Sequence, residues 1–225
     1  MQVGAVRAPI YAVFANQVNF QVPALVPDAA TTDVRVITSC GTADEKISAP
    51  ESVPARAATP EFFYFSQTSD GRNPIAGLNA VTGQPVGATF PAAKPGDIVA
   101  LYATGFGDTD PSLDAGQIPD SIVRVKGNVQ IQFGGKALPA GNILYVGIAP
   151  FNPGLYQVNL KIPDDTADGD MAVTVLIGSQ STPVGPYLTV KGSGIAPSDV
   201  GKHLELLRMQ RIGSVDRERL EIRKR

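Results

Sequence analysis

The heptapeptide QVNFQVP at residues 17–23 recurs 140 positions later as QVNLKIP at residues 157–163. Apolar and polar residues alternate in both copies, so every second side chain lies on one face, as in a half-buried β-strand. Each copy is followed, past an acidic turn, by a second alternating strand, which holds Val34 and Val36 in the first copy. The matching strand of the second copy holds Val173 and Val175. Two copies of one supersecondary unit predict two similar domains.

Short apolar runs separated by Pro and Gly fill the chain up to about residue 191. Residues 97–104 are almost all apolar, which is typical of a strand covered on both faces. The pair Gly134-Gly135 predicts a two-residue hairpin turn, because glycine adopts positive φ without steric cost. Many short strands with turn signals at this spacing favour an antiparallel sandwich. Clear alternation marks residues 129–133 as another strand, and it extends the two strands already described over residues 33–38 and 171–177.

We therefore predict an all-β chain with two immunoglobulin-like antiparallel β-sandwiches and a short helical C-terminal tail. The first sandwich spans residues 1–65 and is N-terminally incomplete, because the strand that opens the second copy has no counterpart before the first. A structured connector spans residues 66–92, and the second sandwich spans residues 93–191. Residues 192–225 are predicted to form a flexible joint and a basic, partly helical tail.

An incomplete sandwich exposes apolar surface and unpaired backbone N–H and C=O groups at one edge. We expect that the native gene product extends further upstream, or that another segment covers this edge. The predicted modes of contact are edge-strand pairing or a dimer through the first sandwich.

Composition excludes several classes of protein. Apolar residues make up 43% of the 225 residues, enough for a core and too many for a wholly disordered chain. No apolar run reaches the roughly 18 residues of a membrane span. Residues 1–191 carry 11 basic and 16 acidic residues, so nucleic acid is not a predicted partner of this part. A single cysteine, Cys40, and a single histidine, His203, exclude an intrachain disulfide and the common structural zinc sets.

Acidic loops are the candidate ligand clusters. Asp108, Asp110 and Asp114 follow the strand at residues 97–104, and a second acidic loop spans residues 164–170. Closely spaced carboxylates on a turn can supply several of the oxygens that Ca²⁺ requires, so calcium is the one candidate cofactor. The loop lacks the glycine and terminal glutamate of an EF-hand, and plain solvated turns are the alternative.

No catalytic set is predicted. The one histidine lies in the predicted tail, no Gly-x-Ser-x-Gly elbow is present, and Gly105-Phe106-Gly107 lacks the third glycine of a dinucleotide fingerprint. Cys40 is interpreted as a small buried or half-buried residue rather than a nucleophile. The aromatic run at residues 62–65 is interpreted as closing the first sandwich and packing at the domain junction, with an exposed aromatic platform as the alternative.

Three spaced segments carry a resemblance to a known family. Residues 17–23, residues 93–107 (AKPGDIVALYATGFG) and residues 154–163 (GLYQVNLKIP) resemble, in order, three strands of the acidobacterial (Solibacter-type) uncharacterised C-terminal domain. Residues 73–80 also resemble its connector. The resemblance covers residues 1–191 and implies paired immunoglobulin-like sandwiches in an extracellular or cell-surface setting, with no established catalytic residues. Exported members carry an upstream leader that these residues do not include, so the exported setting is an expectation that rests on the resemblance. After the last strand that resembles the family, 34 more residues follow.

The sequence thus predicts a non-enzymatic, extracellular structural or adhesive module of a larger exported bacterial protein. Its partners would be other domains of the parent protein or surface macromolecules, with no nucleic acid and no membrane span. The alternative is a glycan- or calcium-binding β-sandwich module, although the chain has no Trp and only six Tyr on which sugars could stack.

Overall fold

The structure is a computed structural model that describes residues 1–24 and 31–192. Within these residues the fold is all-β, as predicted, and every pair of named strands is antiparallel. One short 3-10 helix, at Ala140–Asn142, interrupts the strands. The predicted helical tail at residues 193–225 lies outside the described residues. No helix in the described part of the chain is long and apolar enough to cross a membrane.

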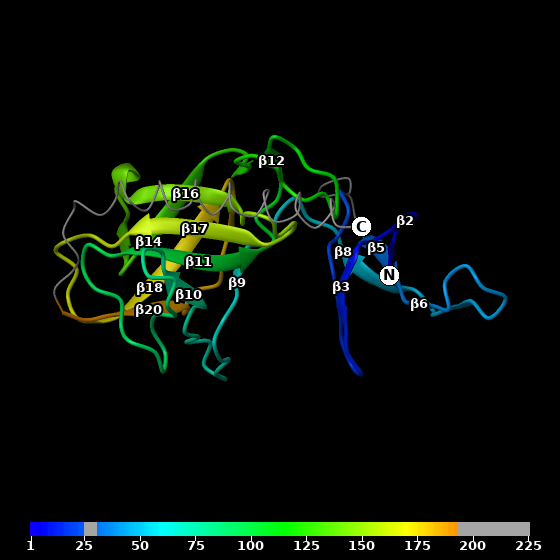
Figure 1. Ribbon diagram of the computed structural model, residues 1–225, viewed down its shortest axis with the longest axis horizontal. Coiled ribbons are helices and arrows are strands. Elements are labelled where there is room, and N and C mark those ends of the chain that lie inside the picture. Colours follow the sequence, from blue (N-terminus) through cyan, green and yellow to red (C-terminus); the bar gives the residue numbers. More distant parts are fainter. Residues whose placement is uncertain (25–30, 193–225) are drawn as a thin grey trace, which may run out of the picture.

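Eight short strands form the N-terminal unit, which lies at one end of the long axis (Figure 1). One sheet has the order β2-β1-β5-β8, and two further pairs are β3-β4 and β6-β7. The bounds are β1 (Gln2–Val3), β2 (Val6–Arg7), β3 (Ile10–Val13), β4 (Val18–Phe20), β5 (Thr31–Arg35), β6 (Ile37–Thr38), β7 (Lys46–Ile47) and β8 (Glu51–Pro54).

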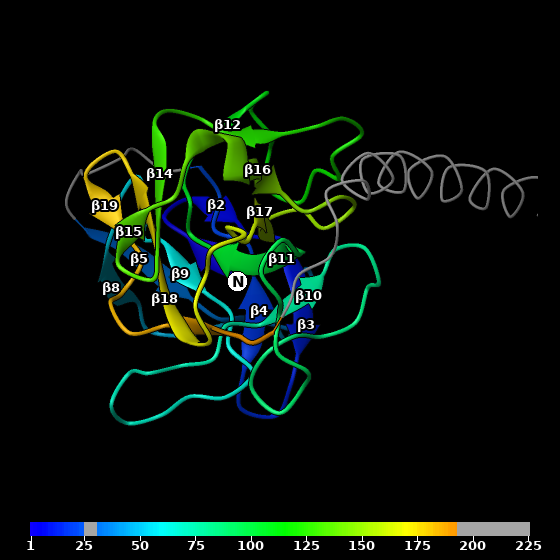
Figure 2. The ribbon, with the colours of Figure 1, turned by 90° about the vertical axis from the view of Figure 1, so that its left-hand side faces the viewer.

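Twelve strands form the body, which holds two facing sheets (Figure 2). The first sheet has the order β10-β11-β17-β16-β13-β12, with β9 also paired to β11. Its strands are β9 (Glu61–Phe62), β10 (Gly77–Asn79), β11 (Ile98–Thr104), β12 (Thr109–Asp110), β13 (Arg124–Val125), β16 (Ile143–Ile148) and β17 (Tyr156–Lys161). The second has the order β15-β14-β18-β19, with β20 also paired to β18. Its strands are β14 (Val129–Phe133), β15 (Lys136–Ala137), β18 (Gly169–Ile177), β19 (Gln180–Ser181) and β20 (Tyr187–Val190).

The core of the body lies between these two sheets. Leu101 and Val158 enter it from the first sheet, and Ile131, Val175 and Leu188 from the second, and all five are buried. Burial of each such side chain stabilises the fold by about 2 kcal/mol. β11 is buried along most of its length between β10 and β17, which confirms the prediction of a strand covered on both faces.

The segment between the predicted sandwiches also joins the body. β9 and β10 come from either side of residue 65, and both pair with β11. Phe62 is buried in the body core, where its ring meets that of Phe106 edge to face. Phe62, the first residue of the aromatic run at residues 62–65, therefore packs into the core of the body rather than into the N-terminal unit.

Two hairpins, one in each part, have the same hydrogen-bond pattern. The Gly4 N–H donates to the Asp33 carbonyl at 2.8 Å in the turn between β1 and β2. The Gly134 N–H donates to the Ala172 carbonyl at 2.8 Å in the turn between β14 and β15. Gly134 and Gly135 have φ of +58° and +77°, and Phe133 pairs with Lys136, so the predicted two-residue turn is confirmed.

Two further strand pairs share a register. In β3-β4 the Cα partners are Ile10 with Phe20, Ala12 with Asn19 and Val13 with Val18. In β16-β17 they are Ile143 with Leu160, Tyr145 with Asn159 and Val146 with Val158, so both pairs contain a register shift at the same place. A side-chain bond also recurs: Nε2 donates to the asparagine Oδ1 at 2.6 Å from Gln17 to Asn19 and at 2.7 Å from Gln157 to Asn159.

Candidate functional site

The N-terminal unit and the body meet at a polar junction. The Tyr11 hydroxyl lies 2.6 Å from the Pro153 carbonyl oxygen and 2.8 Å from Oε1 of Gln21. The Gly116 N–H donates to the same Gln21 oxygen at 2.8 Å. Tyr11 lies at the register shift of β3, between Ile10 and Ala12, and Gln21 follows β4, so one hairpin of the N-terminal unit supplies both side chains of the junction.

Two glycines let the linking segment pass close to the body. Gly105 has φ of +70°, and a Cβ built there would lie 2.1 Å from the Thr59 carbonyl oxygen. Gly107 has φ of +80°, and its Cβ would lie 2.7 Å from the Ala57 carbonyl oxygen. Since side chains cannot fit at such distances, the Gly105-Phe106-Gly107 motif is explained by backbone packing. The Thr59 N–H donates to the Gly105 carbonyl at 2.8 Å and fixes this approach.

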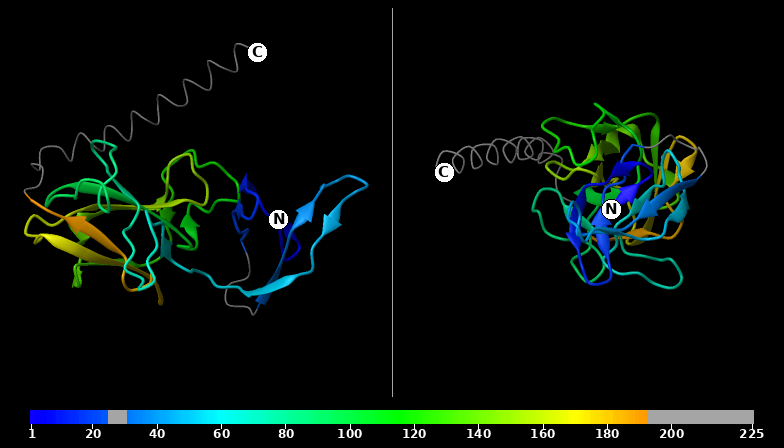
Figure 3. Two further views of the ribbon diagram at one scale, coloured as in Figure 1. Left: turned by 90° about the horizontal axis from the view of Figure 1, so that it is seen from below. Right: turned by 90° about the vertical axis from the view of Figure 1, so that its right-hand side faces the viewer.

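A cavity of about 420 Å³ adjoins the junction. The linking segment at residues 55–59 lines it together with Gly105, Gly107 and Gly154 from the body. The wall that the N-terminal unit supplies includes the apolar residues Val3, Phe20, Val22, Val34 and Val53, and also the polar residues Tyr11, Gln21 and Thr32. The view from below shows the sheets of the N-terminal unit beside this end of the body (Figure 3). We call this feature the junction cavity.

Few titratable groups line the junction cavity. The Tyr156 hydroxyl donates to the Gly107 carbonyl, and burial, with a smaller contribution from the Asp108 carboxylate, raises the pKa of Tyr156 to about 12. Burial also raises the pKa of Tyr11. Both phenols are therefore neutral near pH 7, where each can act as a hydrogen-bond donor. The cavity therefore combines apolar surface and two neutral phenols with the ionisable residues Arg56 and Asp108.

The three aspartates predicted to bind calcium lie on the chain between β11 and β13. Asp110 ends β12, and the backbone of Asp114 exchanges hydrogen bonds with Gln117, at 3.0 Å each. Asp108 accepts a bond from the Lys126 N–H through its carbonyl and lines the junction cavity. Among residues 1–24 and 31–192, no group of three or more His, Cys, Asp or Glu is placed to hold a metal. Calcium binding stays a prediction, without an assembled ligand set in the described chain.

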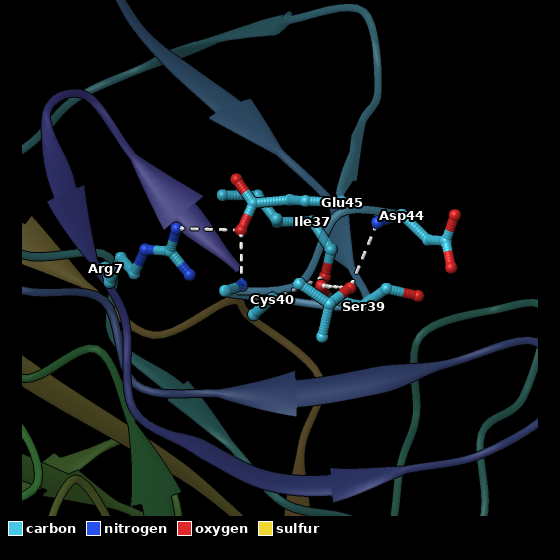
Figure 4. A network of polar contacts seen from close by, with 8 residues as sticks. Arg7, Ile37, Ser39, Cys40, Asp44 and Glu45 are labelled. Atoms are coloured by element: carbon cyan, nitrogen blue, oxygen red, sulfur yellow. Dashed lines mark hydrogen bonds and ion pairs between the residues drawn. The ribbon is translucent and has the colours of Figure 1, made fainter.

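Cys40 belongs to a polar turn of the N-terminal unit (Figure 4). Its thiol is exposed and lies 3.5 Å from the Ile37 carbonyl oxygen, so the prediction of a buried or half-buried residue was wrong. The Glu45 carboxylate accepts from the Gly41 N–H at 2.7 Å and pairs with Arg7 at 3.4 Å. The bond from Gly41 and then that from Arg7 lower the pKa of Glu45. Hydrogen bonds among its own residues therefore hold this turn. The exposed ion pair between Arg7 and Glu45 contributes little to stability.

An aromatic patch lies on the body. Phe63, Phe65 and Phe90 are exposed, and the rings of Phe65 and Phe90 lie 4.9 Å apart between centroids. Tyr64 lies between Phe63 and Phe65 in the sequence, and its hydroxyl donates to the Glu61 carboxylate. Burial raises the pKa of Tyr64, and the hydrogen bond with Glu61 raises it further. The run at residues 62–65 therefore divides, with Phe62 in the core and the two later phenylalanines at the surface.

Comparison with family models, curated proteins and solved structures gives no match to this chain. Sequence reasoning did not identify Tyr11 and Gln21 as junction residues, and a polar side chain on each strand of a hairpin was the only available signal. His203, the single histidine, lies outside the described residues.

Proposed function

We propose that the chain is a non-enzymatic structural or adhesive module that works by surface contact within a larger exported bacterial protein. One observation carries this proposal: eight large apolar or aromatic side chains of the N-terminal unit are exposed, and two of them, Tyr11 and Val22, line the junction cavity. The eight are Val6, Ile10, Tyr11, Val13, Phe14, Val22, Val36 and Ile47. Exposed apolar side chains in this number, on a unit of short strands, favour contact with another macromolecule.

As part of this proposal, the N-terminal unit and the body each contain one copy of the same immunoglobulin-like supersecondary unit. The matched register of β3-β4 and β16-β17 supports it, as does the shared hydrogen-bond pattern of the two hairpins. The resemblance of residues 1–191 to the acidobacterial C-terminal domain supports an extracellular or cell-surface setting.

Cell fractionation tests this proposal. An antibody raised against the chain is used to probe cytoplasmic, envelope and culture fractions of the native organism. We expect a signal in the envelope or culture fraction, on a polypeptide longer than 225 residues. A signal confined to the cytoplasm, on a polypeptide of 225 residues, would overturn the proposed setting and the proposed parent protein together.

Glycan binding is the second candidate function, and the aromatic patch of Phe63, Phe65 and Phe90 favours it. Neighbouring exposed rings can stack against sugar faces, and Phe63 also lines a hollow that contains the polar side chains of Gln67 and Asn73. A polysaccharide-binding screen would support this function if Phe65→Ala abolished a signal that Phe14→Ala, an exposed phenylalanine of the N-terminal unit, left intact.

A further inference from the structure

We infer that the free edge of β4 is an acceptor site for one additional β-strand from another polypeptide, with the apolar pattern of β11. The strand would lie antiparallel to β4 and close the N-terminal unit over the junction cavity. This inference deepens the proposed function by stating the chemistry of the partner. It depends on the proposed equivalence of the two parts, and not on where the protein is located in the cell.

The body provides an internal template for the strand that β4 lacks. β17 pairs with β16 along one edge and with β11 along the other, where Val99 faces Leu160 and Leu101 faces Val158. β4 pairs with β3 in the register of β17 with β16. Among residues 1–24 and 31–192, no strand pairs with the other edge of β4.

The backbone of β4 is oriented to accept such a strand. The Phe14 N–H donates to the Gln17 carbonyl at 2.7 Å, and the Gln21 N–H donates to the Pro9 carbonyl at 3.0 Å. Backbone groups of successive residues point to opposite edges of a strand, so those of Val18, Phe20 and Val22 point to the free edge. In the template, the equivalent residue Ile162 donates its N–H to the Asp97 carbonyl at 2.9 Å.

The side chains of β17 that lie next to β11 are more buried than their counterparts on β4, which has no such neighbour among the described strands. Val158, Leu160 and Ile162 are all 0% exposed next to β11. Their counterparts Val18 and Phe20 are only half-buried, and Val22 is 55% exposed. Phe20 and Val22 also line the junction cavity. A strand with the pattern of β11 would place two or three apolar side chains into that space, as Val99, Leu101 and Ala103 do in the body.

Added strands recognise a sheet edge by main-chain hydrogen bonds and select sequence through alternate side chains. The test therefore uses the full chain and a synthetic peptide with the sequence of residues 94–105, KPGDIVALYATG. Calorimetry measures affinity, and hydrogen exchange follows the amides of Val18, Phe20 and Val22. We expect one peptide to bind per chain and to slow the exchange of these three amides.

Matched variants separate edge pairing from nonspecific adhesion. Val22→Asp, which puts a charge on the cavity face, should weaken binding by about tenfold or more. Asn19→Asp, which puts the same charge on the opposite face of the same strand, should leave affinity within about twofold. A peptide with Val99→Asp and Leu101→Asp should lose binding. Unchanged hydrogen exchange of the Phe14 and Gln21 amides, which bond within the β3-β4 hairpin, would show that each protein variant keeps this hairpin folded.

Register gives a second measurement. In a Cys40→Ser background, a peptide carrying Ala100→Cys should form a disulfide with Asn19→Cys faster than with Gln17→Cys, because Ala100 faces Asn159 in the template. Slow hydrogen exchange of the Val18, Phe20 and Val22 amides in the chain without peptide, at every protein concentration, would mean that the chain covers its own edge. Protection that rises with protein concentration would mean that a second copy covers it. Either result, or no peptide binding to an unprotected edge, would overturn the inference.

Discussion

Gly105 shows how a single residue positions the two parts of the molecule. Its φ of +70° and the 2.1 Å approach of the Thr59 carbonyl oxygen leave no room for a methyl group. We expect Gly105→Ala to lower the free energy of unfolding by about 3 kcal/mol, from left-handed strain together with overpacking. Gly135→Ala is the control, because Gly135 also has positive φ but no atom within 4 Å of a Cβ, and about 1 kcal/mol is expected. Urea unfolding would measure both, and equal losses would contradict the packing explanation.

Ionisation of the Tyr156 phenol makes the free energy of unfolding depend on pH in the alkaline range. The pKa of Tyr156 is raised from 10.0 to about 12 in the folded chain, so folding favours the neutral phenol. The stabilisation is fully present below pH 10 and is lost as the pH rises through 12, by up to about 2 kcal/mol.

We therefore expect Tyr156→Phe to lose less stability than the parent chain between pH 9.5 and pH 11. At pH 7 the variant should be less stable by about 1 kcal/mol, because the hydrogen bond to the Gly107 carbonyl is removed. Urea titrations at several pH values give both quantities. Parallel pH curves for the variant and the parent would show that Tyr156 is not the group responsible.

At the scale of the element, β4 and β17 have similar sequences but different packing. Val158 is completely buried between β11 and β16, whereas Val18 is half-buried on β4, which pairs only with β3 among the described strands. We expect Val158→Ala to cost about 2 to 3 kcal/mol and Val18→Ala less than about 1 kcal/mol, because only the first leaves a closed cavity. Chemical denaturation monitored by far-UV circular dichroism would measure both. Similar costs would mean that the N-terminal hairpin is as tightly packed as the body.

Element by element, periodicity and turn chemistry predicted much of this fold. Alternation located β4, β14, β17 and β18, and the Gly134-Gly135 turn predicted the β14-β15 hairpin. These features are local, so they are readable from neighbouring residues. The single strand predicted at residues 33–38 is instead divided between the end of β5 and β6, and Val36 between them is exposed. The pairing of β9 and β10 with β11 is not local, and nothing in the aromatic run at residues 62–65 indicates which sheet it joins.

The candidate site was harder to predict for the same reason. Asp108, Asp110 and Asp114 are close in sequence, but the turn does not bring them together with enough ligands in the described chain. The junction cavity, in contrast, joins residues as distant as Val3 and Tyr156. Cys40 follows a strand that suggested burial, yet it lies on a turn that projects its thiol to the surface.

The whole molecule combines a closed body with an open N-terminal unit, and this asymmetry has a consequence for unfolding. The body core joins both of its sheets, whereas most strands of the N-terminal unit have two to four residues and largely exposed or half-buried side chains. Regions with few buried apolar contacts open at lower free energy than the core. We expect amides of β3, β4, β6 and β7 to exchange at least about tenfold faster than those of β11 and β17.

The junction predicts how far the two parts unfold independently. Tyr11 and Gln21 connect the β3-β4 hairpin to Pro153 and Gly116, and these are hydrogen bonds at the surface rather than a shared core. Tyr11→Phe should therefore speed hydrogen exchange in β3 and β4 while exchange in β11 stays within about twofold. Phe14→Leu, an exposed change at the end of the same hairpin, is the control. If Tyr11→Phe accelerated exchange in β11 as much as in β4, the two parts would unfold as one cooperative unit, and the N-terminal unit would draw its stability from the body rather than from its own sheets.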